Sequence, residues 1–115
     1  MRLVFGICMD LNPYEFKDNS QFELAQYCKE QKADGLIFLS AWNVYIYKYW
    51  KKDHEPENED QNGMLNYWVW RLHPLVDRAD NKNNKKFVFI CSDKCGKDEK
   101  TEYVGTSCVI KLNPV

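Results

Sequence analysis

Short apolar runs separated by polar stretches form the main pattern of the chain. Apolar residues, many of them β-branched or aromatic, fill positions 3–7, 36–39 and 87–91, and a longer stretch follows at 103–112. Strands that lose polar alternation are typical of a sheet covered on both faces. We therefore predict four buried strands in an α/β domain.

Two helices are predicted between these strands. Residues 21–31 form an amphipathic helix, and Ser20 and Glu23 have the spacing of a capping box at its start. Residues 64–79 form the second helix, and Pro74 lies inside it. Because proline lacks a backbone N–H and clashes with the preceding turn, it should kink or split that helix.

The order strand, helix, strand at the start of the chain defines a βαβ unit. Its crossover is right-handed in nearly all proteins, so the first two strands should be parallel, with their carboxyl ends at the same edge of the sheet. Cys8 and Trp42 then lie at that edge, where open α/β sheets place their ligand sites. The last two strands are joined by a short turn and should form an antiparallel hairpin.

Composition narrows the classes of protein that fit. The 115 residues suit one domain, 1–115, and 44% hydrophobic and 29% charged residues are typical of a globular chain. The net charge of -1 and the pI near 6.1 give no electrostatic reason to expect a nucleic-acid partner. The longest apolar run, 35–44, is too short to span a bilayer, and no signal peptide is recognisable, so no membrane association is expected.

The five cysteines are odd in number and irregularly spaced. Without a secretory signal they indicate reduced thiols and a cytoplasmic location. Cys91 and Cys95 are four positions apart, and neither His54 nor His73 lies at ligand spacing from them. We therefore expect no metal site. A redox or zinc role for this cysteine pair is an alternative that the zinc content of the protein would decide.

Cys8 is the residue with the clearest chemical potential. It ends the first predicted strand and opens a turn, a place where a side chain is thrust out at the top of a sheet. A nearby helix amino terminus and loop amides favour thiolate over thiol, and the N–H of Met9 is placed to form part of an oxyanion hole. On the cysteine alone, an inert core thiol is the better interpretation.

The residues around Cys8 reverse that interpretation. The sequence Gly6-Ile-Cys8-Met-Asp10 followed by Glu15 resembles the G-I-C-x-D block of the nitrilase superfamily of carbon–nitrogen hydrolases, in which the cysteine is the nucleophile. Similar landmarks follow in order, namely the strand that leads into Ser40-Ala41-Trp42, the helix over 68–79, the strand that leads to Gly96, and Gly105-Thr-Ser107. The segment from Cys8 to Tyr14 is similar to the protein N-terminal amidase branch of that superfamily.

This resemblance implies a fold and a chemistry. The fold would be the C-terminal portion of an αββα sandwich, with a mixed sheet and flanking helices, in a homodimer formed through the helix after the nucleophile. Cys8 would attack the side-chain amide of an N-terminal Asn or Gln of a protein, as in the N-degron pathway, or a small amide, with the Met9 N–H at the oxyanion. The substrate pocket would be lined by Trp42, Ser40, Asp10 and Glu15. The reaction needs no metal and no organic cofactor.

Three departures limit the resemblance. In Asn12-Pro13-Tyr14-Glu15 the proline stands one place earlier than in the family's Arg-Phe-Pro-Glu. Ser92-Asp93 stands where Asn-Arg is usual, and the family's Glu general base and Lys, which precede the nucleophile, are missing because only seven residues precede Cys8. Asp10 is expected to hydrogen-bond the turn and Glu15 to orient loop groups at the rim, so neither should replace that base. The chain alone is therefore expected to be inactive. The alternative is a truncated, non-catalytic remnant of a nitrilase-like protein.

Overall fold

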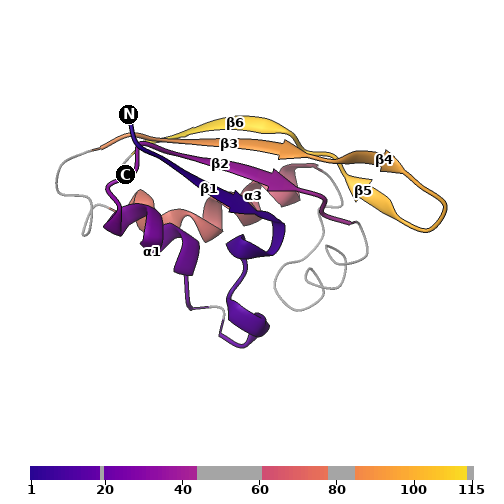
Figure 1. Cartoon of the computed structure of the whole chain (residues 1–115), viewed down its shortest axis with the longest axis horizontal. Coiled ribbons are helices and arrows are strands. Elements are labelled where there is room, and N and C mark those ends of the chain that lie inside the picture. Colours follow the sequence, from indigo (N-terminus) through magenta and orange to yellow (C-terminus); the bar gives the residue numbers. More distant parts are fainter. Residues whose placement is uncertain (19, 44–60, 78–84, 114–115) are drawn as a thin grey trace.

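The computed structural model describes residues 1–18, 20–43, 61–77 and 85–113, which form a four-stranded sheet with helices on one face (Figure 1). In chain order the elements are β1 (Leu3–Ile7), η1 (Cys8–Leu11), η2 (Tyr14–Phe16), α1 (Glu23–Glu30), β2 (Gly35–Ser40), α3 (Gln61–Arg71), η3 (His73–Leu75), β3 (Phe87–Asp93), β4 (Cys95–Lys97), β5 (Glu102–Val104) and β6 (Cys108–Leu112). The η elements are short 3-10 turns. The fold is therefore of the predicted mixed α/β class.

The strands of the main sheet have the order β1-β2-β3-β6. β1 pairs in parallel with β2 and β2 with β3, whereas β6 runs antiparallel to β3. Both predicted pairings, parallel for the first two strands and antiparallel for the last two, are confirmed. The carboxyl ends of β1, β2 and β3 consequently meet at one edge. The register there places Ile7 opposite Leu39 and Ser40 opposite Asp93.

Helices α1 and α3 lie against one face of the sheet, which we call the covered face (Figure 1). At its centre the rings of Phe38 and Phe89 pack with Trp68 of α3, with ring centroids 5.8 to 6.2 Å apart. Other fully buried side chains around this cluster are Leu36, Met64, Leu72 and Cys28. Each such apolar side chain stabilises the fold by about 1.5–3 kcal/mol relative to exposure.

The opposite face of the sheet, which we call the open face, is uncovered within the described ranges. Successive side chains of a strand point to opposite faces, so the strands that bury one apolar row display another. The exposed members of this row are Leu3, Phe5, Ile7, Leu39, Ile90 and Val109. Phe5 and Val109 leave 69% and 71% of their surface in contact with solvent. The predicted lack of polar alternation is present, but only one of the two apolar faces is covered.

The two predicted helices differ from the observed ones at their ends. Pro74 lies in η3, after α3 has ended at Arg71, so the predicted break at this proline is confirmed. The capping box predicted at the start of the first helix is wrong. Phe22 is the N-cap of α1, and the N–H and hydroxyl of Ser20 donate instead to Asp18, at 2.9 and 2.6 Å. No helix among the described residues is long and apolar enough to cross a membrane.

The predicted single strand at 103–112 is also wrong. β5 and β6 are separate strands, because the chain changes direction at Gly105, whose φ is +65°. A Cβ at this glycine would approach the Cβ of Cys95 to 2.5 Å, so the bend requires glycine both for its left-handed backbone and for the close contact. β5 pairs with β4 in a second, two-stranded sheet, where the sequence predicted only a turn.

Candidate active site

Cys8 lies at the junction between β1 and the 3-10 turn η1, at the carboxyl edge of the sheet. Its φ is +46°, in the left-handed region that a side chain other than glycine occupies at a cost of about 1–3 kcal/mol. The residue is half-buried and packs against the core. A cysteine held in a strained, sharp turn at the end of a strand is the geometry that presents a nucleophile.

Ser40, at the end of β2, is the side chain next to the Cys8 sulfur. Its hydroxyl oxygen lies 3.9 Å from the sulfur and is itself buried. Asp93, which ends β3, lies opposite Ser40 in the parallel register of β2 and β3. The carboxyl ends of three parallel strands thus each contribute one polar side chain to a single cluster. Cys8 and Ser40 were expected at the site, whereas Asp93 was not.

Asp93 is buried and held from several directions. One carboxylate oxygen accepts the Trp42 N–H at 3.4 Å, and the other accepts the Thr106 N–H at 3.1 Å. Its own N–H donates to the Ser107 hydroxyl at 2.9 Å. Burial raises the pKa of the Asp93 carboxyl above its ordinary value, although the hydrogen bonds from the backbone and from Ser40 oppose that shift.

Trp42 contributes to this edge through its backbone. Its indole is buried and packs against the Tyr67 ring with centroids 6.1 Å apart, while its N–H binds Asp93. The prediction that Cys8 and Trp42 would end near the same edge agrees with this arrangement. The indole itself, however, lies in the core.

Asp10 braces the turn that follows Cys8. Its carboxylate accepts the Ile7 N–H at 2.8 Å, which ties the end of β1 to η1. The Met9 carbonyl accepts the Asn12 N–H at 3.0 Å, and the Met9 sulfur lies 3.6 Å from the Asn12 side-chain nitrogen. Asp10 therefore forms the backbone hydrogen bond expected of it in the sequence. The amide of Met9 directly follows Cys8 in this turn, which the Asp10 hydrogen bond holds in place.

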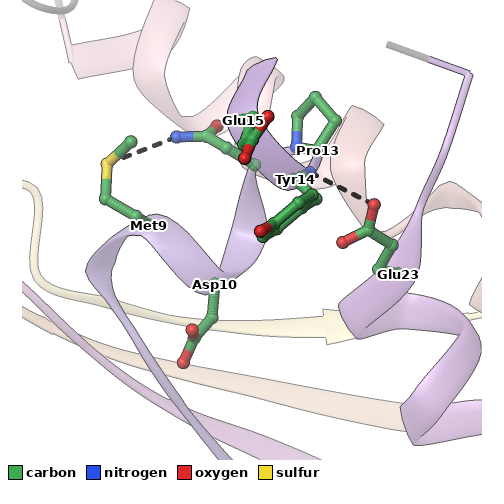
Figure 2. A pocket seen from close by; sticks show the side chains of 7 residues that line it. Met9, Asp10, Pro13, Tyr14, Glu15 and Glu23 are labelled. Carbon is green, nitrogen blue, oxygen red and sulfur yellow. Dashed lines mark hydrogen bonds between the residues drawn. The ribbon is translucent and has the colours of Figure 1, made fainter. Parts of the chain in front are cut away.

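A hollow of about 280 Å³ lies on the outer side of this turn (Figure 2). Its lining is formed by Met9, Asp10, Asn12, Pro13, Tyr14, Glu15 and Glu23. Glu15 has a left-handed φ of +52° and forms an ion pair with Lys17, and the Glu23 carboxylate accepts the Tyr14 N–H at 3.1 Å. Met9, Asp10 and Glu15 of the expected set thus border one hollow, whereas Cys8, Ser40 and Trp42 lie outside its lining.

Two side chains of α3 hold the segment after Cys8 against the core. The buried Arg71 guanidinium donates from Nε to the Leu11 carbonyl at 2.9 Å and from Nη2 to the Gln21 carbonyl at 2.6 Å. The Tyr67 hydroxyl donates to the Asn12 side-chain oxygen, and burial raises the pKa of the Tyr67 phenol to about 12. Sequence reasoning missed both residues. The available signal was a charged residue at 71, beside the apolar positions of a predicted helix.

The cysteine pair proposed as an alternative centre is not arranged as a metal site in the described part of the chain. Cys91 is buried, which raises the pKa of its thiol to about 12, while Cys95 is exposed. Among the described residues, no group of three His, Cys, Asp or Glu side chains is placed to hold a metal ion.

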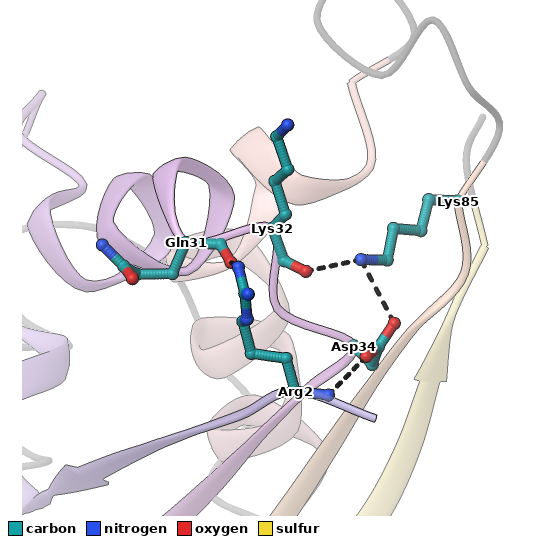
Figure 3. Close-up of polar contacts among 5 residues, drawn as sticks. All are labelled: Arg2, Gln31, Lys32, Asp34 and Lys85. Carbon is teal, nitrogen blue, oxygen red and sulfur yellow. Dashed lines mark hydrogen bonds and ion pairs between the residues drawn. The ribbon is translucent and has the colours of Figure 1, made fainter.

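Polar contacts also tie the opposite, amino-terminal edge of the sheet (Figure 3). The Asp34 carboxylate accepts the Arg2 N–H at 2.6 Å and pairs with the Lys85 ammonium at 3.2 Å. The Arg2 guanidinium donates to the Gln31 carbonyl at 2.7 Å. The hydrogen bond from the Arg2 N–H, followed by the Lys85 contact, holds the pKa of Asp34 below its ordinary value. These contacts tie the start of β1 to the residues that precede β2 and β3.

Known proteins resemble the chain in sequence and in structure, although no family model matches it. A protein N-terminal amidase from Schizosaccharomyces pombe is 29% identical over 120 residues, which cover 94% of this chain and 38% of that protein. Two crystal structures of N-terminal amidase match 96% of this chain, one of them with an Asn-Glu-Ala peptide at a TM-score of 0.71 and 14% identity, the other at 0.72 and 15%. The chain has the fold of an N-terminal amidase.

That likeness has a limited extent. The chain spans 38% of the curated amidase and 52% of each matched crystal structure. It therefore corresponds to one part of an N-terminal amidase, in keeping with the resemblance to a C-terminal portion found in the sequence.

Proposed function

We propose that this chain is the nucleophile-bearing part of a cysteine amidohydrolase that deamidates N-terminal Asn or Gln of proteins. The observation that carries this proposal is the position of Cys8, in a left-handed turn at the carboxyl edge of the sheet, with the Ser40 hydroxyl beside its sulfur. The similarity to N-terminal amidases in both sequence and fold supports the same conclusion.

In the proposed reaction, the Cys8 thiolate attacks the carbon of the substrate's side-chain amide. The carbon–nitrogen bond then breaks, the nitrogen takes up a proton and leaves as ammonia, and water hydrolyses the thioester that remains. The Met9 N–H is the proposed donor to the oxyanion that forms during the attack. The Glu and Lys that the resemblance requires would come from outside these 115 residues. A cytoplasmic location would give such an enzyme access to newly exposed protein N-termini.

The hollow beside η1 suits the charged end of such a substrate. The side chains of Glu15 and Glu23 line it together with Met9, the residue that follows Cys8 in the chain (Figure 2). A protein N-terminus carries an α-ammonium group, which an internal Asn or Gln lacks. Two carboxylates near that group would favour an N-terminal residue over an internal one.

The test is ammonia release by the complete protein that contains this chain, with peptides that begin with Asn, Gln or Asp. We expect release from Asn or Gln peptides and none from Asp peptides, because only the first two carry an amide. Free asparagine, glutamine and simple amides distinguish a small-molecule amidase from an enzyme that acts on proteins.

The matched variants are Cys8→Ala and Cys95→Ala, which remove one half-buried and one exposed thiol. Cys8→Ala should abolish ammonia release, since the nucleophile is lost, and Cys95→Ala should leave it unchanged. Retained activity in Cys8→Ala would refute the nucleophile assignment.

The second candidate is a non-catalytic chain, and the uncovered apolar face of the sheet favours it for the isolated 115 residues. We expect the purified chain to show no turnover with any of these substrates. Measurable amidase activity from that product would contradict this expectation.

A further inference from the structure

Asn12 joins helix α3 to the turn that follows Cys8. Its side chain is buried, with 3% of its surface exposed. Its Oδ1 accepts a hydrogen bond from the Tyr67 hydroxyl of α3, and its Nδ2 lies 3.6 Å from the Met9 sulfur. Its backbone N–H donates to the Met9 carbonyl at 3.0 Å. We propose that Tyr67 is a positioning residue that acts through Asn12 to hold Met9, an inference that rests on the proposed function for its role in the reaction.

The Tyr67 hydroxyl determines which end of the Asn12 amide faces Met9. A side-chain amide has an oxygen that only accepts hydrogen bonds and a nitrogen that only donates them. Because the oxygen takes the phenol proton, the nitrogen is left to face the Met9 sulfur, which is a weak acceptor. This contact is the dashed line at the Met9 sulfur in Figure 2. Loss of the phenol hydroxyl therefore removes the contact that orients the amide.

Tyr67 is itself held firmly enough to orient a neighbour. Its ring packs against the buried Trp42 indole, with centroids 6.1 Å apart. Burial raises the pKa of the Tyr67 phenol to about 12, so the hydroxyl keeps its proton and can donate it at neutral pH. Arg71, one helical turn later, donates to the Leu11 carbonyl at 2.9 Å. Helix α3 thus restrains two adjacent residues of the same segment, Leu11 and Asn12.

Two parts of Met9 enter the proposed reaction. Its N–H is the proposed oxyanion donor, and its side chain, 39% exposed, lines the hollow that we assign to the charged end of the substrate. Asn12 restrains the Met9 backbone at the carbonyl and the Met9 side chain at the sulfur. An unbranched methionine side chain has three rotatable bonds and adapts easily, so a contact at its sulfur limits the positions it adopts.

The first measurement is the NMR spectrum of the methionine methyl groups in the 115-residue chain. The chain has three methionines, of which Met1 is fully exposed and Met64 is fully buried. These two signals mark a freely rotating and a fixed side chain. Tyr67→Phe, which keeps the ring and removes the hydroxyl, should move the Met9 signal toward that of Met1. An unmoved Met9 signal would overturn the proposal.

The second measurement is the turnover of Asn- or Gln-starting peptides by the complete protein. Tyr67→Phe should lower kcat by about tenfold, because the oxyanion donor is displaced rather than removed, and outright removal of such a donor costs about 10²–10³ in kcat. The matched control is Tyr103→Phe, which removes a hydroxyl that donates to Asp98 on the β4–β5 hairpin, and it should leave kcat unchanged. An active wild type with an unchanged kcat in Tyr67→Phe would overturn the role in the reaction.

A double variant separates positioning from simple stabilisation. Tyr67→Phe leaves the buried Asn12 oxygen without this donor and should therefore lower the free energy of unfolding. Adding Asn12→Leu removes the unpaired group, so the double variant should regain most of that stability. It still lacks the amide that contacts Met9, so its kcat should stay low and its Met9 signal should stay shifted. Recovery of kcat together with stability would show that Tyr67 only stabilises the fold.

The two measurements distinguish this inference from the proposed function. If the complete wild-type protein releases no ammonia, the proposed function is refuted, whereas the methyl spectrum still tests the hold of Tyr67 on Met9. If the wild type is active and the Met9 signal is unmoved in Tyr67→Phe, this inference is refuted and the proposed function stands.

Discussion

The two faces of the main sheet carry the same kind of side chain in different surroundings. On the covered face, Phe38 and Phe89 pack against Trp68 and are fully buried. On the open face, Phe5 of β1 and Val109 of β6 lie mostly in solvent, although these strands are the direct neighbours of β2 and β3. Sequence alone does not distinguish the two rows, since both are apolar and both follow the two-residue period of a strand.

The difference between the faces indicates that the open face is built to be covered. A row of exposed apolar side chains that shares one face of a sheet is a feature of an interface. The matched amidase structures are almost twice as long as this chain, which covers 52% of them. In an αββα sandwich, a second sheet packs on the first, and that arrangement would cover the open face.

The largest expected effect is a loss of stability when a buried ring of the covered face is removed. Phe38→Ala should lower the free energy of unfolding by about 3–5 kcal/mol, because it removes a fully buried ring and leaves a cavity against Trp68 and Phe89. Urea denaturation followed by circular dichroism measures this loss. A loss below about 1 kcal/mol would show that the packing of the covered face is not as close as the ring contacts indicate.

The next largest effect is expected at Arg71 of α3, the helix that packs on the covered face. Arg71→Ala should cost about 2–3 kcal/mol, because the carbonyls of Leu11 and Gln21 lose their buried donors. The segment between these carbonyls should also become more sensitive to protease. Arg2→Ala removes an exposed guanidinium that binds a single carbonyl, and it should cost clearly less. Equal losses in both variants would contradict the anchoring role of Arg71.

A third test uses the pH dependence of unfolding. Asp93 lies on the buried side of β3, and its pKa is raised in the folded state, mainly by burial. Its contribution to stability is therefore fully present below the unfolded pKa of about 3.9 and is lost as the pH rises through the folded pKa. The free energy of unfolding of the wild type minus that of Asp93→Asn should fall between pH 3.5 and 7.

Asp34 provides the control of opposite sign for this measurement. Its pKa is lowered by the Arg2 amide and by Lys85, so its contribution is present above the unfolded pKa and is lost as the pH falls. The wild type minus Asp34→Asn difference should therefore rise over the same pH range. If both differences changed with pH in the same direction, the opposite pKa shifts would be contradicted, namely the rise by burial at Asp93 and the fall by hydrogen bonding at Asp34.

The smallest expected effect is on the open face. Phe5→Ala should change the free energy of unfolding by less than about 0.5 kcal/mol, because the ring is already 69% exposed. Binding of a hydrophobic dye and self-association of the chain should decrease, as an exposed apolar patch becomes smaller. If this variant were as unstable as Phe38→Ala, the open face would already be covered in solution, and the contrast between the faces would fail.

The strands were predictable because their signal is local. The apolar runs at 3–7, 36–39 and 87–91 coincide with β1, β2 and β3 to within two residues, and Pro74 splits the second helix as its chemistry requires. The capping box failed because the Glu23 carboxylate binds the Tyr14 amide, which is nine positions away in the sequence. A competing tertiary contact of this kind leaves no mark in the local pattern.

The site was predictable only in part, for a similar reason. Cys8 was proposed from its place at the end of a strand and from the residues around it, and the structure describes it directly after β1. Asp93 was noted only as a departure from the family, because its place opposite Ser40 depends on the register between β2 and β3, whose residues are 53 positions apart. Arg71 was missed because its partners are backbone carbonyls, which every residue type carries.

The hydrogen bond from the Ile7 amide to the Asp10 carboxylate has a consequence for how the sheet can grow. β1 pairs only with β2 among the described strands, so its outer rim is available for an added strand. At Ile7 that rim cannot pair with an added strand, because the Ile7 N–H already donates to the Asp10 carboxylate of its own chain. A strand that extends the sheet past β1 must therefore stop before Ile7, so the carboxyl end of β1 and the turn after it stay outside any such extension.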